Sequence, residues 1–364
     1  MLWLGLPVTV SFFIGFLLFY RFPVLKLKEK KLVNPPKISI IIPARNEEHN
    51  LPALLSSLKN QTVLPHEIIV VDDNSSDGTV RTAKEYGVQV ISSGTLPEGW
   101  LGKPWSCYQG ALGAGGDVFV FLDADTFLEP DALEKIINKF SEKPGAISIF
   151  PYHRTKRIYE SFSAIFNLMQ LAGMSRISLK KNSDLTGLSG PCLVVSCKEY
   201  FKIDGHKSVR GEVLEHFIMA DIFKQYNIPV HLFRGKGTLN VRMYPKGWRS
   251  LITGWSKSFS RGADRTPKLN MSLSVMWISG LIVSSTFFIF SIFSGKIIDL
   301  SFWTAIYLLW VAQLFILFRR IGNFPLWSAL LYPLNLIFFL TVFAFSSYLS
   351  SKNNKVEWKG RKIN

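Results

Sequence analysis

Apolar residues follow different patterns in different parts of the chain, and each pattern predicts a different kind of element. Near both ends they form long runs without charge, whereas the central region alternates short apolar runs with polar, glycine-containing turns. Short runs rich in Ile and Val predict buried strands, and leucines spaced three and four apart predict helices. Strands are expected at residues 37–43, 67–73, 88–91, 118–122 and 146–150. Helical patterns separate them, so the predicted fold class is α/β with a mostly parallel sheet.

The first helix of this region is predicted from side-chain spacing. Leu51, Leu54, Leu55 and Leu58 would form one apolar helix face, and Asn46 is the expected N-cap, with acidic residues in the first turn. A later helix is expected to begin around residues 100–105. The stretch 158–174 is apolar and amphipathic. It fits a helix at a membrane interface or along an apolar groove, and it fits a plain core helix equally well.

The N-terminal run predicts a membrane anchor. Leu2 to Tyr20 holds 19 uncharged, mostly apolar residues and is followed by Arg21 and several lysines. About 20 such residues span a bilayer core. A cleaved signal peptide would carry its basic residues first. Because positive charge favours the cytoplasmic side, the central region is expected in the cytoplasm.

Three further apolar runs lie near the C-terminus, at residues 271–293, 301–318 and 325–349. Pro333 lies inside the third run, and the tail that follows is basic. Three plain crossings would place this tail outside, against the positive-inside tendency, so a re-entrant or interfacial third segment is expected. The predicted division is an anchor at 1–24, an α/β domain at 36–268, membrane helices at 269–350 and a basic tail at 351–364.

Composition agrees with a multi-pass protein of the cell membrane. The chain is 48% hydrophobic and carries a formal net charge of +16. It shows no basic helix and no aromatic RNA-binding motif, so a membrane surface explains this charge better than nucleic acid does. Cys107, Cys192 and Cys197 have no metal-ligand spacing, which suits a reducing compartment and buried thiols.

Acidic residues end two of the predicted strands. Asp123 and Asp125 follow residues 118–122, and Asp72 and Asp73 end the strand at 67–73. Residues i and i+2 of an extended chain share a face, and the carboxyl ends of parallel strands meet at one edge. Four carboxylates at this edge suit Mg²⁺ or Mn²⁺ held against phosphate. For the Asp-Ala-Asp sequence alone, an acidic turn after a strand is the plain alternative.

Together these sequences resemble family 2 glycosyltransferases of GT-A fold. The resemblance rests on 38–47, 71–77 and 123–125 and covers roughly residues 37–261. It implies an inverting enzyme that uses a nucleotide sugar and a divalent metal. By position it implies nucleotide contacts from Pro43, Arg45, Glu47 and Asp73, a ribose or sugar contact from Asp123, a diphosphate contact from Lys103 and metal binding by Asp125.

A closer resemblance spans nearly the whole chain. Residues 151–169 and 356–361 are similar to the branch of this family that esterifies C30 carotenoid acids with glucose in staphyloxanthin-type biosynthesis. This implies UDP-glucose as donor and an apolar carotenoid carboxylic acid as acceptor. The alternatives are a transferase for another lipid, of ceramide, hopanoid or polyprenyl type, and a membrane protein that binds nucleotide sugars without turnover.

The chain departs from the family at the expected general base. The family usually has Glu-Asp at its catalytic helix, and this chain has Glu215-His216. Glu215 can be the base, His216 can be the base, or no strong base is needed. The last case fits a carboxylic acid acceptor, which is already ionised at pH 7 because its reference pKa is about 4.

A second departure concerns the acceptor side. Processive synthases of the family carry Gln-x-x-Arg-Trp, which is absent here and favours a single transfer to a lipid. Arg242, Trp248 and Lys257 are candidates for the diphosphate or for membrane anchoring. Phe162 and Phe166 are candidates for the apolar acceptor chain.

Overall fold

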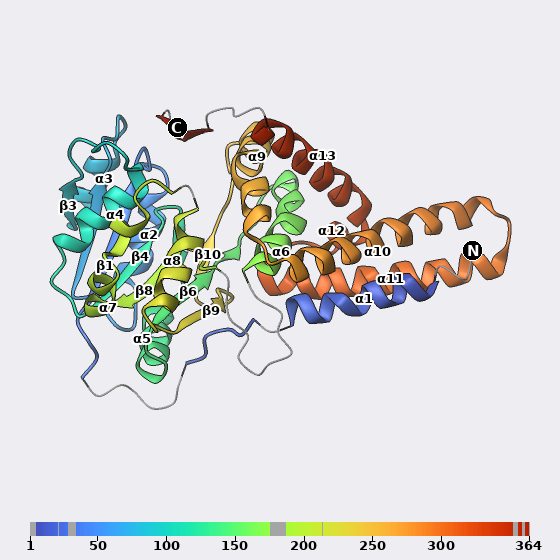
Figure 1. Ribbon diagram of the computed structural model, residues 1–364, viewed down its shortest axis with the longest axis horizontal. Coiled ribbons are helices and arrows are strands. Elements are labelled where there is room, and N and C mark those ends of the chain that lie inside the picture. The colour runs from blue at the N-terminus through green and yellow to red at the C-terminus, as the bar shows by residue number, and fades with distance from the viewer. Residues whose placement is uncertain are drawn as a thin grey trace. The chain divides into compact units, whose positions relative to one another are not determined.

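The structure is a computed structural model that describes residues 5–20, 22–27, 34–174, 187–212, 214–351, 356–358 and 361–363 (Figure 1). The chain divides into two compact units. The sheet unit comprises Pro23–Tyr152, Leu185–Arg242 and Lys355–Asn364. The helical unit comprises Met1–Phe22, His153–Asp184 and Met243–Asn354.

A seven-stranded sheet forms the centre of the sheet unit, in the order β3-β2-β1-β4-β8-β6-β9. Its strands are β1 (Ile38–Ala44), β2 (Glu67–Asp72), β3 (Gln89–Ser92), β4 (Val118–Leu122), β6 (Ala146–Phe150), β8 (Cys192–Ser196) and β9 (Val230–Arg234). Strand β8 runs antiparallel to β4 and β6, and the other pairs are parallel. The five predicted strands and the mostly parallel sheet are therefore confirmed, with β3 placed one residue later than expected.

Helices cover the two faces of this sheet (Figure 1). They are α2 (Leu51–Lys59), α3 (Thr79–Glu85), α4 (Gly102–Leu112), α5 (Ala132–Glu142), α7 (Cys197–Lys202), η3 (Gly205–Val209) and α8 (Glu215–Gln225). Shorter strands are β5 (Thr126–Leu128), β10 (Leu239–Val241), β7 (Tyr152–His153), β11 (Val356–Trp358) and β12 (Arg361–Ile363).

Alternating side chains of β1 build two cores. Ile40 and Ile42 join one buried cluster with the leucine face of α2, and Ile41 joins another cluster on the opposite face. All four leucines of α2 are fully buried, as their spacing predicts. The expectation for Asn46 is wrong, because α2 begins only at Leu51. Asn46 instead has φ +54°, in a left-handed turn.

The helical unit contains three helices that are long and apolar enough to cross a membrane. Its elements are α1 (Gly5–Phe19), η2 (Ile158–Ser163), α6 (Ala164–Gly173), α9 (Trp248–Arg265), α10 (Lys268–Phe293), α11 (Ile297–Ile321), α12 (Leu326–Leu330) and α13 (Tyr332–Ser351). The three long helices are α10, α11 and, up to Leu349, α13. Helix α1 has 15 residues, or about 22 Å at 1.5 Å per residue. It is shorter than the predicted anchor, whose residues 2–4 lie outside the described part.

Polar contacts fix α1 against α10 and α11. Gln313 donates to the carbonyl oxygen of Phe12 at 2.8 Å and accepts from Trp277 Nε1 at 3.0 Å. At the other end of α1, Arg320 donates to the carbonyl oxygen of Tyr20 at 3.2 Å. The C-terminal ends of α1 and α11 therefore lie together. A cation at this end of a helix also interacts favourably with the helix dipole.

Two features of the helical unit bear on the sequence predictions. Residues 164–168 are almost fully buried, which favours the core-helix alternative for α6. Pro333 lies in the first turn of α13, where proline is tolerated because the N–H it lacks has no helical partner. The third apolar segment is divided at Leu331, just before this proline, into α12 and α13, and α13 alone is long enough to cross a membrane. The re-entrant or interfacial third segment stays a prediction.

Candidate functional site

One pocket of about 190 Å³ collects every residue that the sequence assigned to the nucleotide and the metal. These are Pro43, Arg45, Glu47, Asp73, Lys103, Asp123 and Asp125. Strand β1 lies between β2 and β4 and is parallel to both, so the carboxyl ends of the three strands and the loops that follow reach the same edge. Residues that are far apart in the sequence thereby line one pocket.

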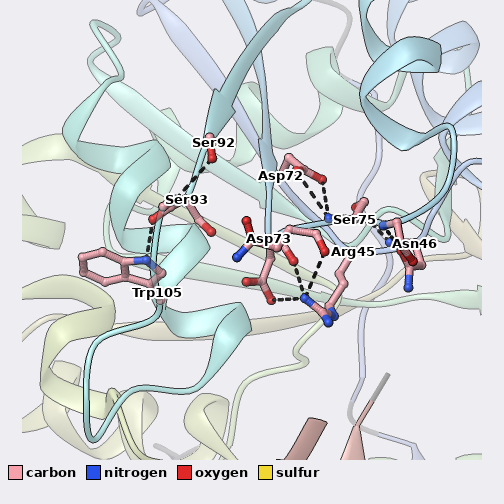
Figure 2. A network of polar contacts seen from close by, with 11 residues as sticks. Arg45, Asn46, Asp72, Asp73, Ser75, Ser92, Ser93 and Trp105 are labelled. Carbon is pink, nitrogen blue, oxygen red and sulfur yellow. Dashed lines mark hydrogen bonds and ion pairs between the residues drawn. The ribbon is translucent and has the colours of Figure 1, made fainter. Parts of the chain in front are cut away.

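Arg45 supports the loop after β2 (Figure 2). Its Nη1 donates to the carbonyl oxygens of Asp73 and Asn74, at 2.5 and 3.3 Å, and lies 3.9 Å from Asp73 Oδ2. The Asp73 side chain is only 3% exposed. A buried carboxylate is stabilised by a cationic partner, and Arg45 provides this positive charge from the wall of the pocket.

Asp72 has a different role from the one expected. Its carboxylate accepts from the backbone N–H of Ser75, at 3.2 and 3.4 Å, and it does not line the pocket (Figure 2). Asn46 Oδ1 accepts from the N–H of Ser76 at 2.8 Å. The quartet of carboxylates at the pocket therefore consists of Glu47, Asp73, Asp123 and Asp125, and Asp72 holds the loop.

Lys103, in the first turn of α4, joins three separate segments. Its Nζ lies 2.6 Å from Asp123 Oδ1 and 3.6 Å from Glu215 Oε1, and it donates to the carbonyl oxygen of Gly190 at 3.2 Å. Burial lowers the pKa of Lys103, but the two carboxylates outweigh this effect and raise the pKa well above its ordinary value. Lys103 is therefore positively charged at any physiological pH.

Glu215 and His216 open α8, as the resemblance implies, and line a second, smaller cavity of about 20 Å³. Lys103 and Asp123 line both cavities, and a volume of this size holds about one water. His216 Nδ1 lies 4.0 Å from Glu215 Oε2. Burial lowers the pKa of His216, helped by Lys103 and opposed by Glu215 and Asp123. The imidazole is therefore neutral at pH 7.

Asp125 is exposed to the larger pocket. The enclosing protein and the Asp123 carboxylate raise its pKa, against a lowering by Lys103. Among the described residues, no three His, Cys, Asp or Glu side chains are arranged to hold a metal ion. Mg²⁺ commonly takes only one or two carboxylates and completes its shell with phosphate and water. The single free carboxylate of Asp125 fits an ion of that kind.

Sequence reasoning missed Ser106. Its side chain is fully buried, lines the larger pocket and has no hydrogen-bond partner within the described part of the chain. It lies one helical turn after Lys103 on α4, so both residues face the same side. A serine inside a helix belongs to no recognisable motif. Its helical spacing from Lys103 is the sequence feature that could have suggested Ser106 as a pocket residue.

The candidates for the acceptor lie in the helical unit, where aromatic rings gather. The Phe162 ring centroid is 5.1 Å from that of Trp248 and 5.3 Å from that of Phe338, and Phe166 stacks on Trp255 at 4.7 Å. Tyr159 Oη donates to Tyr244 O at 2.9 Å and accepts from the N–H of Gly247 at 2.9 Å, which fixes the turn before α9.

The two other acceptor-side candidates belong to different elements. Arg242 follows β10 in the sheet unit. Lys257 belongs to α9, and its side chain lies outside the described part.

The chain is similar to known glycosyltransferases. The profile of glycosyl transferase family 2 matches residues 39–201. The 4,4'-diaponeurosporenoate glycosyltransferase of Staphylococcus aureus (strain USA300) is 37% identical over 97% of this chain and 95% of its own length. A mannosyltransferase of Pyrobaculum calidifontis, solved with GDP-mannose and Mn²⁺, shares the fold with a TM-score of 0.54 and 15% identity, over 96% of this chain and 95% of its own.

We predict that Asn46 stabilises the loop after β2 in two separable ways. Asn46→Gly keeps the positive φ and loses the hydrogen bond to Ser76, whereas Asn46→Ala loses the bond and adds the strain of a left-handed alanine, about 1–2 kcal/mol. Hydrogen–deuterium exchange of residues 73–79 should therefore be faster in Asn46→Gly than in the unmodified protein, and faster still in Asn46→Ala. Equal exchange in all three proteins would contradict this role.

Proposed function

Because the chain belongs to glycosyl transferase family 2 and is a glycosyltransferase, we propose that it transfers glucose from UDP-glucose to the carboxylate of an apolar carotenoid acid. The single observation that carries the proposal is the larger pocket, which gathers four carboxylates, Arg45 and Lys103 at the carboxyl edge of the sheet. The name of the S. aureus relative, which is similar over nearly its full length, supports the carotenoid acid as acceptor.

The donor occupies the larger pocket. Asp73 and the wall from Pro43 to Glu47 hold the nucleoside, and Asp123 contacts the ribose or the sugar. The buried hydroxyl of Ser106 is available to a phosphate oxygen because no described protein group uses it. Lys103 adds positive charge on the same side of the pocket.

Asp125 would hold a divalent cation, Mg²⁺ or Mn²⁺, together with the donor. When bound, such an ion would neutralise negative charge on the diphosphate and make it a better leaving group. The protein around it supplies the orientation. Asp125 faces the pocket from the loop after β4, and the salt bridge from Lys103 fixes Asp123 two residues earlier.

The acceptor is a long apolar molecule, so it remains associated with the membrane. The aromatic cluster of the helical unit, with Phe162, Phe166 and Trp248, offers apolar surface to such a chain. Trp248 is 46% exposed, unlike the fully buried Phe166, so it is the member best able to contact a ligand.

We place the chain in the cell membrane as a multi-pass protein with its sheet unit in the cytoplasm. Arg319 and Arg320 end α11, and Arg320 binds the C-terminal end of α1. The hairpin between α10 and α11 carries one basic residue, Lys296, against the two arginines at the end of α11. The positive-inside tendency then puts the ends of α1 and α11 inside and the hairpin outside.

Transfer to a carotenoid acid is the direct test. Membranes that contain the protein, UDP-glucose, Mg²⁺ or Mn²⁺ and a C30 carotenoid carboxylic acid should form a hexosyl ester, detected by mass spectrometry. Asp125→Asn should lower the rate at least about a hundredfold, because the metal contributes several kcal/mol. Asp131→Asn is the matched control, since Asp131 pairs with Lys135 outside the pocket and its loss should leave the rate unchanged.

Removal of the metal completes this test. Excess EDTA should abolish transfer, and added Mn²⁺ or Mg²⁺ should restore it. Full activity in EDTA would contradict the metal role. Transfer to a ceramide, hopanoid or polyprenyl lipid, with none to the acid, would contradict the proposed acceptor.

Cysteine labelling tests the orientation. In a Cys197→Ser background, Ser294→Cys in the α10–α11 hairpin should react with a membrane-impermeant maleimide in intact cells. Lys143→Cys, on the surface of the sheet unit, should react only after permeabilisation. The reverse pattern would place the sheet unit outside and contradict the proposed topology.

A further inference from the structure

Lys103 connects the donor pocket to the residues at the start of α8. Its ammonium lies between Asp123, which lines the donor pocket, and Glu215, which lines only the smaller cavity. The Lys103 side chain is 24% exposed and that of Glu215 only 11%. One cation of this chain is therefore shared between the sugar-facing carboxylate of Asp123 and Glu215, one of the two candidates for a general base.

A general base must have a lone pair free to reach the proton of the acceptor. The charge of Lys103 persists at all physiological pH values, so the Glu215 carboxylate faces a permanent positive partner at 3.6 Å. Proton abstraction would convert Glu215 to a neutral acid and forfeit this attraction. The ion pair thus works against Glu215 as a general base.

His216 is a weak alternative. Its surroundings lower its pKa, and the groups that act on it are Glu215, Lys103 and Asp123. A base of low pKa removes a proton from an alcohol inefficiently, since the best catalytic pKa lies near the working pH. Its Nδ1 also faces Glu215 at 4.0 Å, in a cavity with room for about one water.

We propose that this site works without a general base and is therefore specific for acceptors that arrive as anions, of the carboxylate class. This inference rests on the proposed function and explains its acceptor chemistry. A carboxylate oxygen gives an electron pair to C1 of the sugar, and the bond from C1 to the diphosphate oxygen breaks with its electrons leaving on UDP. No proton is transferred, so the step balances without a base. An alcohol would need one.

In this account Lys103 is a positioning residue. It holds the end of β4, the loop at Gly190 and the start of α8 in one arrangement. Its removal would leave Asp123 and Glu215 near each other without a counter-ion, which disturbs the site whatever the acceptor is. Glu215, in contrast, can be replaced by its amide, because Lys103 keeps its shorter ion pair with Asp123.

The test compares a carotenoid acid with the corresponding primary alcohol. Glu215→Gln and His216→Asn should each lower kcat/KM for the acid less than about tenfold, whereas loss of a general base costs about 10²–10⁴-fold. His216→Asp restores the Glu-Asp pair that the family usually has at this helix. This variant should raise kcat/KM for the alcohol. The ratio of kcat/KM for the acid to that for the alcohol should therefore fall, with the acid still preferred. UDP affinity, measured by calorimetry, checks that each variant is folded.

A loss of more than about a hundredfold with the acid in Glu215→Gln, at unchanged UDP affinity, would overturn the inference and make Glu215 the base. The same result in His216→Asn would assign the role to His216. The unmodified protein distinguishes this outcome from failure of the proposed function. If the unmodified protein does not glycosylate the acid, the proposed function itself is contradicted.

The positioning role of Lys103 has its own readout. Lys103→Ala should lower kcat at least about a hundredfold, and added alkylammonium ions, which can occupy the vacated space, should recover part of it. Lys59→Ala, on the surface of α2, is the matched control and should respond to neither change. A Lys103→Ala enzyme of normal kcat would contradict the positioning role.

Discussion

Negative charge gathered at one edge of the sheet is the constraint on which the rest of the site depends. Parallel β1, β2 and β4 deliver their carboxyl ends to the same place, and the pocket there holds four carboxylates. Arg45 and Lys103 each neutralise one of them, Asp73 and Asp123 respectively. The negative charge that remains includes the exposed carboxylate of Asp125, and it favours a cation that is not part of the chain. The pocket is therefore suited to a metal ion with phosphate, and poorly suited to an unaccompanied anion.

The helical unit is subject to a different constraint. Its helices present mostly apolar faces, which distinguish poorly between alternative arrangements of the helices. A few polar groups inside it specify one arrangement. Gln313 links α11 to α1 and α10, Asn270 donates to the Ala172 carbonyl oxygen at 2.8 Å, and Ser346 donates to that of Ser256 at 2.8 Å. In an apolar environment such bonds have no competing water, so a wrong packing would leave them unmade.

Features set by local periodicity could be predicted from the sequence. The strands and the leucine face of α2 follow from the burial of alternate or helically spaced side chains, and the acidic strand ends identified most of the pocket. Features that depend on contacts between distant segments could not. Asp72 resembles its neighbour Asp73 in sequence but is used by the loop, and the pairing of Lys103 with Glu215 joins residues far apart in the chain. The burial of α6 likewise depends on neighbours that its own amphipathic pattern does not reveal.

The central claim is that an oxygen atom of the acceptor carboxylate displaces UDP from C1 of the sugar. It can be tested with a carotenoid acid labelled with oxygen-18 at both carboxyl oxygens, followed by mass spectrometry of the hexosyl ester. Direct attack by the carboxylate predicts that the ester keeps both labelled atoms. Loss of one labelled atom from the ester would show that the acyl carbon was attacked by a sugar hydroxyl, which would contradict this account of the site.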